Sequence, residues 1–208
     1  MTIKSIVFDI GGVLLRSEDE SGRIYLGEKY NLETGWVEKL VFNSSAAQAS
    51  STGLVESDAI WQNVAEYLSL TKSALNEFIY QFWQGDRIDY KLIKFLQNCR
   101  PKFKTALLTN AWMGARTDLQ ERYGIIEGKT VDHILISSEI GIAKPDPRIY
   151  QLLGEVLECH LHEILFVDDF IENILAAEEL GIHAIHFEVG MGLINEIESI
   201  INKIINTR

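Results

Sequence analysis

A chain of 208 residues that is 47% hydrophobic is long enough for one large domain carrying an insertion. Its net charge of −11 argues against nucleic-acid binding, because contact with a phosphate backbone needs a basic face. The sequence has no signal-peptide pattern and no apolar run near the roughly 18 residues that cross a bilayer. The spacing of Cys99 and Cys159 is not that of a zinc site or a structural disulfide. These features predict a cytoplasmic protein without a membrane partner.

The first predicted strand, residues 3–9, is a β-branched run that ends in Asp9 and leads into Gly11 and Gly12. Its hydrophobicity is continuous rather than alternating, which is typical of a parallel strand covered by helices on both faces. The glycine pair lets the backbone turn tightly after the acid and bring a carbonyl close to a bound ion. This turn is therefore a candidate functional loop.

Residues 17–97 interrupt the α/β pattern and predict a small helical cap inserted directly after the first strand. We find no convincing strand in this range and at least three amphipathic helices. The clearest helix, 73–83, places on one face Leu75, Phe78, Ile79, Phe82 and Trp83. We expect its aromatic residues to pack in a core, and we expect the polar stretch 43–53 to form a loop.

Four further apolar runs predict the remaining strands, at 104–110, 132–138, 163–169 and 183–188. Helical patterns separate the later runs, with Asp146 as the N-cap and Pro147 in the first turn of one helix, and Gly181 at the end of the next. Alternating strands and helices predict a doubly wound, mostly parallel, Rossmann-like α/β core formed by residues 1–16 and 98–208.

Polar residues stand at the carboxyl ends of these strands, where open α/β sheets bind ligands. They are Asp9 after the first strand, Thr109 and Asn110 after the second, Lys144 in the loop after the third, and Asp168 and Asp169 after the fourth. Each alone has an ordinary structural explanation: the acids as helix caps, Thr109 and Asn110 as turn residues, and Lys144 as a solvated loop residue. Three acids at one edge repel one another, however, unless a cation or the lysine neutralises them. Ligands that are all oxygen favour Mg²⁺.

Four motifs, in order along nearly the whole chain, resemble those of the haloacid dehalogenase-like hydrolases. They read FDIGGVL, LLTNA, AKPDPRIY and FVDDFIENILAA. The helical insertion resembles the cap that these enzymes carry after the first motif. The dehalogenating members work without metal and resemble SSN where this chain reads VDDF, so the resemblance favours a phosphatase.

The resemblance also implies roles for the residues at the sheet edge. Asp9 would be the nucleophile that attacks phosphorus and forms an aspartyl-phosphate. Thr109 and the neighbouring amide of Asn110 would hold the phosphoryl oxygens, and Lys144 would balance the charge. Electrostatics supports the same roles, because a carboxylate attacks an anionic phosphate only where a metal and a lysine offset the repulsion.

The same resemblance implies a Mg²⁺ site. Its ligands would be Asp9, the backbone carbonyl of Gly11, and Asp169. Asp168 would lie behind them near Lys144, and Asn173 would support the acidic pair.

Position 11 departs from the common DxD pattern of family phosphatases. There the second Asp protonates the leaving group and then activates water, whereas Gly11 offers only its carbonyl. Some phosphatase-like members carry Gly at this position, so the departure does not imply an inactive enzyme. It argues against a mutase, which needs that acid in both transfer steps.

The sequence therefore predicts a Mg²⁺-dependent phosphoric monoester hydrolase acting on a small phosphorylated metabolite beneath a closing cap. The alternatives are a catalytically impaired ligand-binding module of the same fold and a haloacid dehalogenase. Candidates for selecting the substrate are Asn43, Ser44 and Ser45 in the cap, and Arg16 in the segment that leads into it. Neither the metabolite nor the oligomeric state follows from the sequence.

Overall fold

The computed structural model describes residues 2–206, with side chains as far as residue 203. Its main sheet has the strand order β5-β4-β1-β6-β7, and each neighbouring pair is parallel. The strands are β1 (Ser5–Phe8), β4 (Lys104–Thr109), β5 (His133–Ile136), β6 (Ile164–Asp168) and β7 (His183–His186). All five lie within the predicted runs, which confirms the α/β fold with a parallel sheet.

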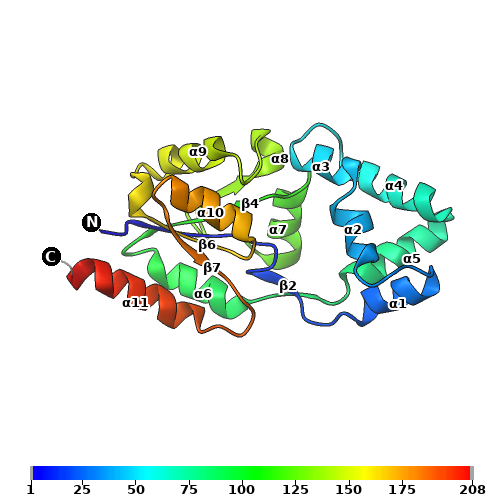
Figure 1. Cartoon of the computed structure of the whole chain (residues 1–208), viewed down its shortest axis with the longest axis horizontal. Coiled ribbons are helices and arrows are strands. Elements are labelled where there is room, and N and C mark those ends of the chain that lie inside the picture. The colour runs from blue at the N-terminus through cyan, green and yellow to red at the C-terminus, as the bar shows by residue number, and fades with distance from the viewer. Residues whose placement is uncertain (1, 207–208) are drawn as a thin grey trace.

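Helices cover both faces of this sheet, with α9 and α10 on one side and α6 and α11 on the other (Figure 1). The elements of this part are α6 (Tyr90–Cys99), α7 (Ala115–Tyr123), α8 (Ser137–Ile140), α9 (Pro147–Leu157), the short 3-10 helix η1 (Leu161–Glu163), α10 (Ile171–Glu179) and α11 (Leu193–Asn206). The predicted helix ends are confirmed: the Asp146 carboxylate accepts the Arg148 N–H at 2.9 Å, and Gly181 follows α10 with φ of +83°.

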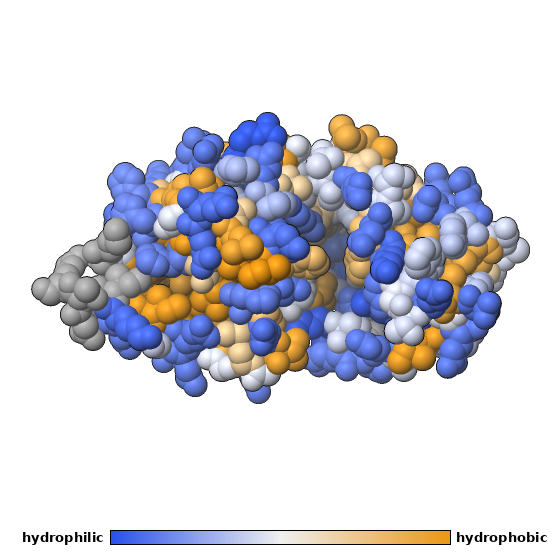
Figure 2. Space-filling view, in the orientation of Figure 1, coloured by the Kyte–Doolittle hydropathy of each residue, from blue (hydrophilic) through white to orange (hydrophobic). Residues whose placement is uncertain are grey.

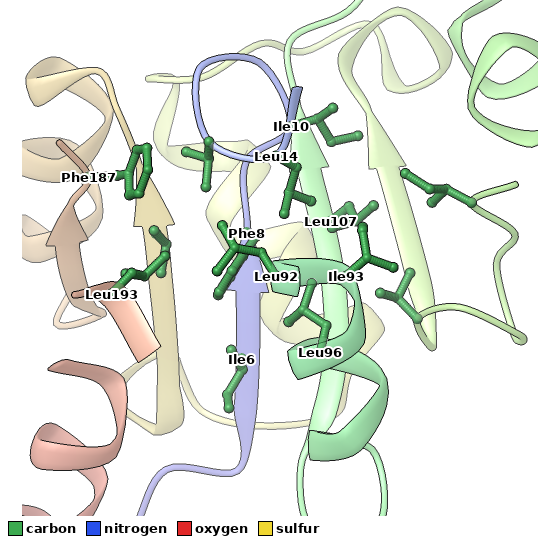
Figure 3. Packing of buried hydrophobic residues seen from close by; sticks show 14 of the residues in the cluster. Ile6, Phe8, Ile10, Leu14, Leu92, Ile93, Leu96, Leu107, Phe187 and Leu193 are labelled. Carbon is green, nitrogen blue, oxygen red and sulfur yellow. The ribbon is translucent and has the colours of Figure 1, made fainter. Parts of the chain in front are cut away.

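Strand β1 is buried on both faces, and this packing holds its carboxyl end in place. Ile6 and Phe8 point to the side of α6, where Leu92 and Leu96 pack near them (Figure 3). Val7 belongs to the opposite cluster, beneath α9 and α10. With β4 and β6 paired along its two edges, β1 delivers the next residue of the chain to a rigid position.

Five helices lie beyond the carboxyl ends of the strands (Figure 1). They are α1 (Ser21–Lys29), α2 (Trp36–Phe42), α3 (Ser45–Ser51), α4 (Asp58–Leu68) and α5 (Lys72–Trp83). They share a hydrophobic cluster of their own, which includes Leu26, Ile60 and Val64. Phe78 and Phe82 of α5 are buried in it, as the sequence predicts.

A two-stranded antiparallel ribbon carries the chain out to these helices and back. It pairs β2 (Leu15–Ser17) with β3 (Asp86–Ile88). The expectation of no strand within 17–97 is therefore wrong. Three-residue strands are too short to show a period of two, and their pairing depends on residues about seventy positions apart.

One further expectation is corrected by the structure. The range 43–53 contains helix α3, because the Ser44 hydroxyl accepts the Ala47 N–H at 3.1 Å and the segment is rich in alanine. Helix α6 starts inside the range predicted for the cap, but it packs against the sheet through Leu92, Ile93 and Leu96. In the part of the chain described, no helix is both long and apolar enough to span a membrane.

Candidate active site

Asp9 lies directly past the end of β1, at the carboxyl edge of the sheet. Its backbone N–H donates to the carbonyl of Val167 in β6 at 2.8 Å. The Lys144 Nζ lies 2.9 Å from Asp9 Oδ1 and donates a hydrogen bond of 2.6 Å to Asp168 Oδ2. Because the Lys144 side chain is only 1% exposed, its charge acts on these two carboxylates with little screening by water.

Burial and neighbouring charges shift the pKa values of the buried groups. Burial raises the pKa of Asp9, with Lys144 opposing this shift and Asp168 adding to it. Burial by itself lowers the pKa of Lys144, but Asp9 and Asp168 outweigh it and raise that pKa overall. Burial also raises the pKa of Asp169 to about 6, and the charges on Asp9 and Asp168 contribute. One lysine therefore does not neutralise the three acids.

The three aspartates converge, but they are not equivalent. Each offers a carboxylate oxygen, and these oxygens lie within 4.8 Å of one another. Asp168 is saturated, since it accepts the Asn173 amide at 3.0 and 3.1 Å and the Phe170 N–H at 2.8 Å. Among the described residues, Asp169 Oδ1 is buried without a hydrogen-bond donor, and Asp9 Oδ1 has the Lys144 ammonium at 2.9 Å. Unsatisfied carboxylate oxygens of this kind fit a hard cation such as Mg²⁺.

Asn173 holds Asp168 and is itself held from the neighbouring helix. It lies buried in the first turn of α10, and its backbone carbonyl accepts the hydroxyl of Tyr150 in α9 at 2.9 Å. Burial raises the pKa of Tyr150 well above its usual range, so the hydroxyl stays a donor. We did not identify Tyr150 from the sequence, although it is the last residue of the motif AKPDPRIY.

The end of β4 supplies a hydroxyl and a support for Lys144. Thr109 is 4% exposed, and its hydroxyl makes no hydrogen bond with the described residues. The Asn110 side chain bonds both backbone groups of Lys144, donating to the carbonyl and accepting from the N–H, each at 2.8 Å. The Asn110 amide thus positions Lys144, and the predicted contact of Asn110 with a phosphoryl oxygen stays a prediction.

Two of the four cap-side candidates already bond elsewhere in the protein. Arg16 pairs with Asp89 at 2.7 Å across the β2–β3 ribbon, and the Ser44 hydroxyl caps α3. Asn43 and Ser45 are exposed, and their predicted role in selecting a substrate stays a prediction.

The two glycines after Asp9 differ in what a side chain would meet. Gly12 has φ of +75°, and a Cβ there would lie 1.9 Å from Asp169 Oδ2. At Gly11 a Cβ meets nothing within 4 Å, and φ lies outside the left-handed region. The glycine at position 12 is therefore required by packing and by backbone conformation, whereas the one at position 11 is not.

We expect Gly12→Ala to destabilise the protein by about 1–3 kcal/mol, because the backbone is strained and Asp169 must move. Gly11→Ala is the matched control, and we expect it to stay within about 1 kcal/mol of the unsubstituted protein. Urea unfolding in the absence of divalent metal measures both. Equal losses of stability in the two variants would contradict this account of the turn.

Comparison with known proteins shows the family. Residues 3–181 match the model of the haloacid dehalogenase-like hydrolases. The D-ribitol-5-phosphate phosphatase of Bacteroides thetaiotaomicron is 26% identical over 217 residues, which span 96% of this chain and 99% of that enzyme. The sesquiterpene phosphatase of Aspergillus oryzae is 22% identical over 201 residues, covering 96% of this chain and 97% of that protein.

Other similar proteins are longer or support only the fold. The matches to bifunctional epoxide hydrolase 2 of mouse, rat and pig cover 18 to 36% of the length of those proteins. A haloacid dehalogenase family enzyme of Bacteroides thetaiotaomicron, crystallised with magnesium and inorganic phosphate, has a TM-score of 0.74 at 20% identity, covering 91% of this chain and 96% of that one. At that identity the likeness establishes the fold. Because the family model matches residues 3–181 of the chain and a solved member has the same fold, the chain belongs to the haloacid dehalogenase-like hydrolases.

Proposed function

We propose that this hydrolase is a Mg²⁺-dependent phosphatase that cleaves the phosphate monoester of a small metabolite. The observation that carries the proposal is the trio of aspartate oxygens within 4.8 Å of one another, with the buried Lys144 paired to two of these aspartates. An anionic substrate approaches such a group only where a cation offsets the repulsion. The two phosphatases that match nearly the whole chain support the same reaction.

Mg²⁺ fits an all-oxygen site in which Asp169 Oδ1 is buried without a donor and the Asp9 carboxylate has lone pairs beyond its contact with Lys144. Asp9, Asp169 and the backbone carbonyl of Gly11 would hold it, while Asp168 remains bonded to Lys144 and Asn173. The bound ion supplies positive charge that attracts the phosphate and weakens its repulsion from Asp9.

Three residues of the chain have distinct roles in the reaction. The Asp9 carboxylate attacks phosphorus, so an O–P bond forms on Asp9 while the P–O bond to the alcohol breaks and the alcohol oxygen takes up a proton from water. Lys144, 2.9 Å from Asp9, neutralises charge on the nucleophile and the phosphate, and the Thr109 hydroxyl donates to a phosphoryl oxygen. Water attacks the phosphorus of the aspartyl-phosphate, releasing phosphate and regenerating Asp9.

Helices α1–α5 would cover this reaction as a cap. The packing of α6 against the sheet moves the proposed boundary from residue 97 to about residue 89, so that the cap comprises 17–89. The core then comprises 1–16 and 90–208. The β2–β3 ribbon is the double connection about which such a cap would move.

The missing acid at position 11 leads to a test of the proposal. We expect aryl phosphates such as p-nitrophenyl phosphate to be cleaved about 10²- to 10⁴-fold faster than alkyl phosphates, the range that a positioned general acid supplies. Because a Cβ at position 11 meets open space, Gly11→Asp should reduce this difference, with Gly11→Ala as the matched control. The measurement is kcat/KM across alcohols of graded pKa.

One outcome would contradict the unassisted departure of the alcohol, and another would contradict the proposed function. A rate that is independent of leaving-group pKa, with chemistry limiting, would show that another residue donates the proton. No hydrolysis of any phosphate monoester in the presence of Mg²⁺ would refute the phosphatase itself.

A further inference from the structure

Four aromatic rings meet where the cap lies against the sheet-containing part, and we call them the aromatic wall. They are Phe42 at the end of α2, Trp61 in α4, Trp83 at the end of α5, and Trp112 in the loop after β4. Their five close ring pairs have centroid separations of 5.7 to 6.3 Å. The wall holds three of the four tryptophans of the chain.

The side chains of the aromatic wall are more exposed to solvent than those of a hydrophobic core. Phe42 is 41% exposed and the three tryptophans are partly exposed, while Phe78 and Phe82 behind them are at most 1% exposed. Within the described residues no indole N–H of the wall has a hydrogen-bond acceptor, although a buried tryptophan usually has one. The wall therefore keeps ring surface and three donors accessible from outside.

The aromatic wall also lies close to the proposed phosphate site. Trp112 follows Thr109 by three residues, so their Cα atoms are at most about 11 Å apart. The intervening loop is fixed, since Asn110 bonds Lys144 and the Ala111 N–H donates to the Ser137 hydroxyl at 3.0 Å. Figure 2 shows the surface indented between the sheet-containing part and the helices α1–α5.

One cation, Arg23, lies against the aromatic wall and is already paired with an acid. Arg23 donates to the Phe82 carbonyl at 3.2 Å and to Asp86 at 2.8 Å, and its guanidinium lies 4.6 Å from the ring centroid of Phe82 and 5.9 Å from that of Phe42 in the wall. Because Arg23 contacts Phe42, the ring faces and indole donors that the wall leaves open are those of its three tryptophans. A polyol needs several matched hydrogen-bond partners, and each hydroxyl buried without one costs binding energy.

We propose that the aromatic wall binds the alcohol portion of the substrate, and that this portion is an apolar group with an aromatic or unsaturated hydrocarbon surface. The inference rests on the proposed phosphatase function, because the phosphate held near Thr109 and Lys144 directs its alcohol toward the cap. Phenolic alcohols satisfy both constraints, since they stack on rings and depart without a general acid.

The test compares three phosphates of primary alcohols, so that leaving-group acidity does not dominate: 2-naphthylmethyl phosphate, geranyl phosphate and ribitol 5-phosphate. We expect kcat/KM for the naphthylmethyl or geranyl ester to exceed that for ribitol 5-phosphate by about 10- to 100-fold. The better of the two identifies which hydrocarbon surface fits. A preference for ribitol 5-phosphate would overturn the inference while leaving the phosphatase intact.

Variants of the wall separate substrate binding from support of the cap. Trp112→Leu should lower kcat/KM for the preferred hydrocarbon ester at least about 10-fold and that for ribitol 5-phosphate less than about 3-fold, with recovery in Trp112→Phe. Trp36→Phe alters a cap tryptophan outside the wall and is the matched control. Equal losses for all three esters would mean that Trp112 only seats the cap, and would overturn the proposal.

A binding measurement does not depend on turnover. In the Trp36→Phe variant the remaining tryptophans are those of the wall, and we expect 4-nitrobenzylphosphonate to quench their fluorescence while methylphosphonate does not. Quenching without hydrolysis of any ester would uphold the wall and refute the phosphatase. Absence of quenching at millimolar ligand would refute the wall.

Discussion

Asp9→Asn is expected to lower kcat by about 10⁴- to 10⁶-fold, the loss seen when a covalent nucleophile is removed. The amide occupies nearly the same volume as the carboxylate but is a far weaker nucleophile. The fold should persist, because Asp9 is buried at an energetic cost that raises its pKa, and Lys144 retains Asp168 as a partner. Steady-state kinetics with p-nitrophenyl phosphate measures the loss.

Two controls make the Asp9 result interpretable. Urea unfolding of the metal-free variant should show stability equal to or above that of the unsubstituted protein, since one of three mutually repelling acids is gone. Acid quenching during turnover should trap a phosphorylated peptide containing Asp9 in the unsubstituted protein and none in the variant. If Asp9→Asn retains a tenth of the rate, covalent catalysis through Asp9 is wrong.

Removal of divalent metal is expected to abolish hydrolysis, and Mg²⁺ is expected to restore it. Asp169→Asn should raise the Mg²⁺ concentration for half-maximal activity by more than about 100-fold, because Asp169 Oδ1 is a buried acceptor without a donor. Asp168→Asn is the matched comparison, and its effect should stay within the 10- to 100-fold typical of a residue that supports a ligand. Full activity in EDTA, or a larger metal effect at Asp168, would contradict the assignment.

The Mg²⁺ requirement should also depend on pH. The pKa of Asp169 is raised to about 6 by burial and by Asp9 and Asp168, so the metal-free carboxyl binds a proton as the pH falls through that value. A protonated carboxyl is a poor ligand, and Mg²⁺ must then displace the proton. The half-maximal Mg²⁺ concentration should therefore rise between pH 7 and pH 5, and this rise should be smaller in Asp169→Asn, where Asp9 is the remaining carboxylate ligand that can bind a proton.

The sequence alone determined the sheet and the set of acids at its edge. Continuous apolar runs separated by helical periodicity predict parallel strands, and parallel strands share one carboxyl edge. Asp9, Lys144 and Asp168 lie at or beyond the ends of different strands of that sheet, so their meeting was predictable without coordinates. In the structure the Lys144 Nζ lies 2.9 Å from Asp9 Oδ1 and 2.6 Å from Asp168 Oδ2. Local pattern and strand order carry this information together.

Only the tertiary structure decided which side chains are already used and which remain available. The sequence predicts that Asn110 binds a ligand. In the structure its side-chain amide is hydrogen-bonded to the backbone of Lys144, 34 positions away. The sequence predicts that Trp83 packs in a hydrophobic core. In the structure it lies in the aromatic wall with Trp112 and is partly exposed. Periodicity shows which face of an element is apolar, but it does not specify what that face meets. Contacts between distant segments arise from how whole elements pack, and that information is not local in the chain.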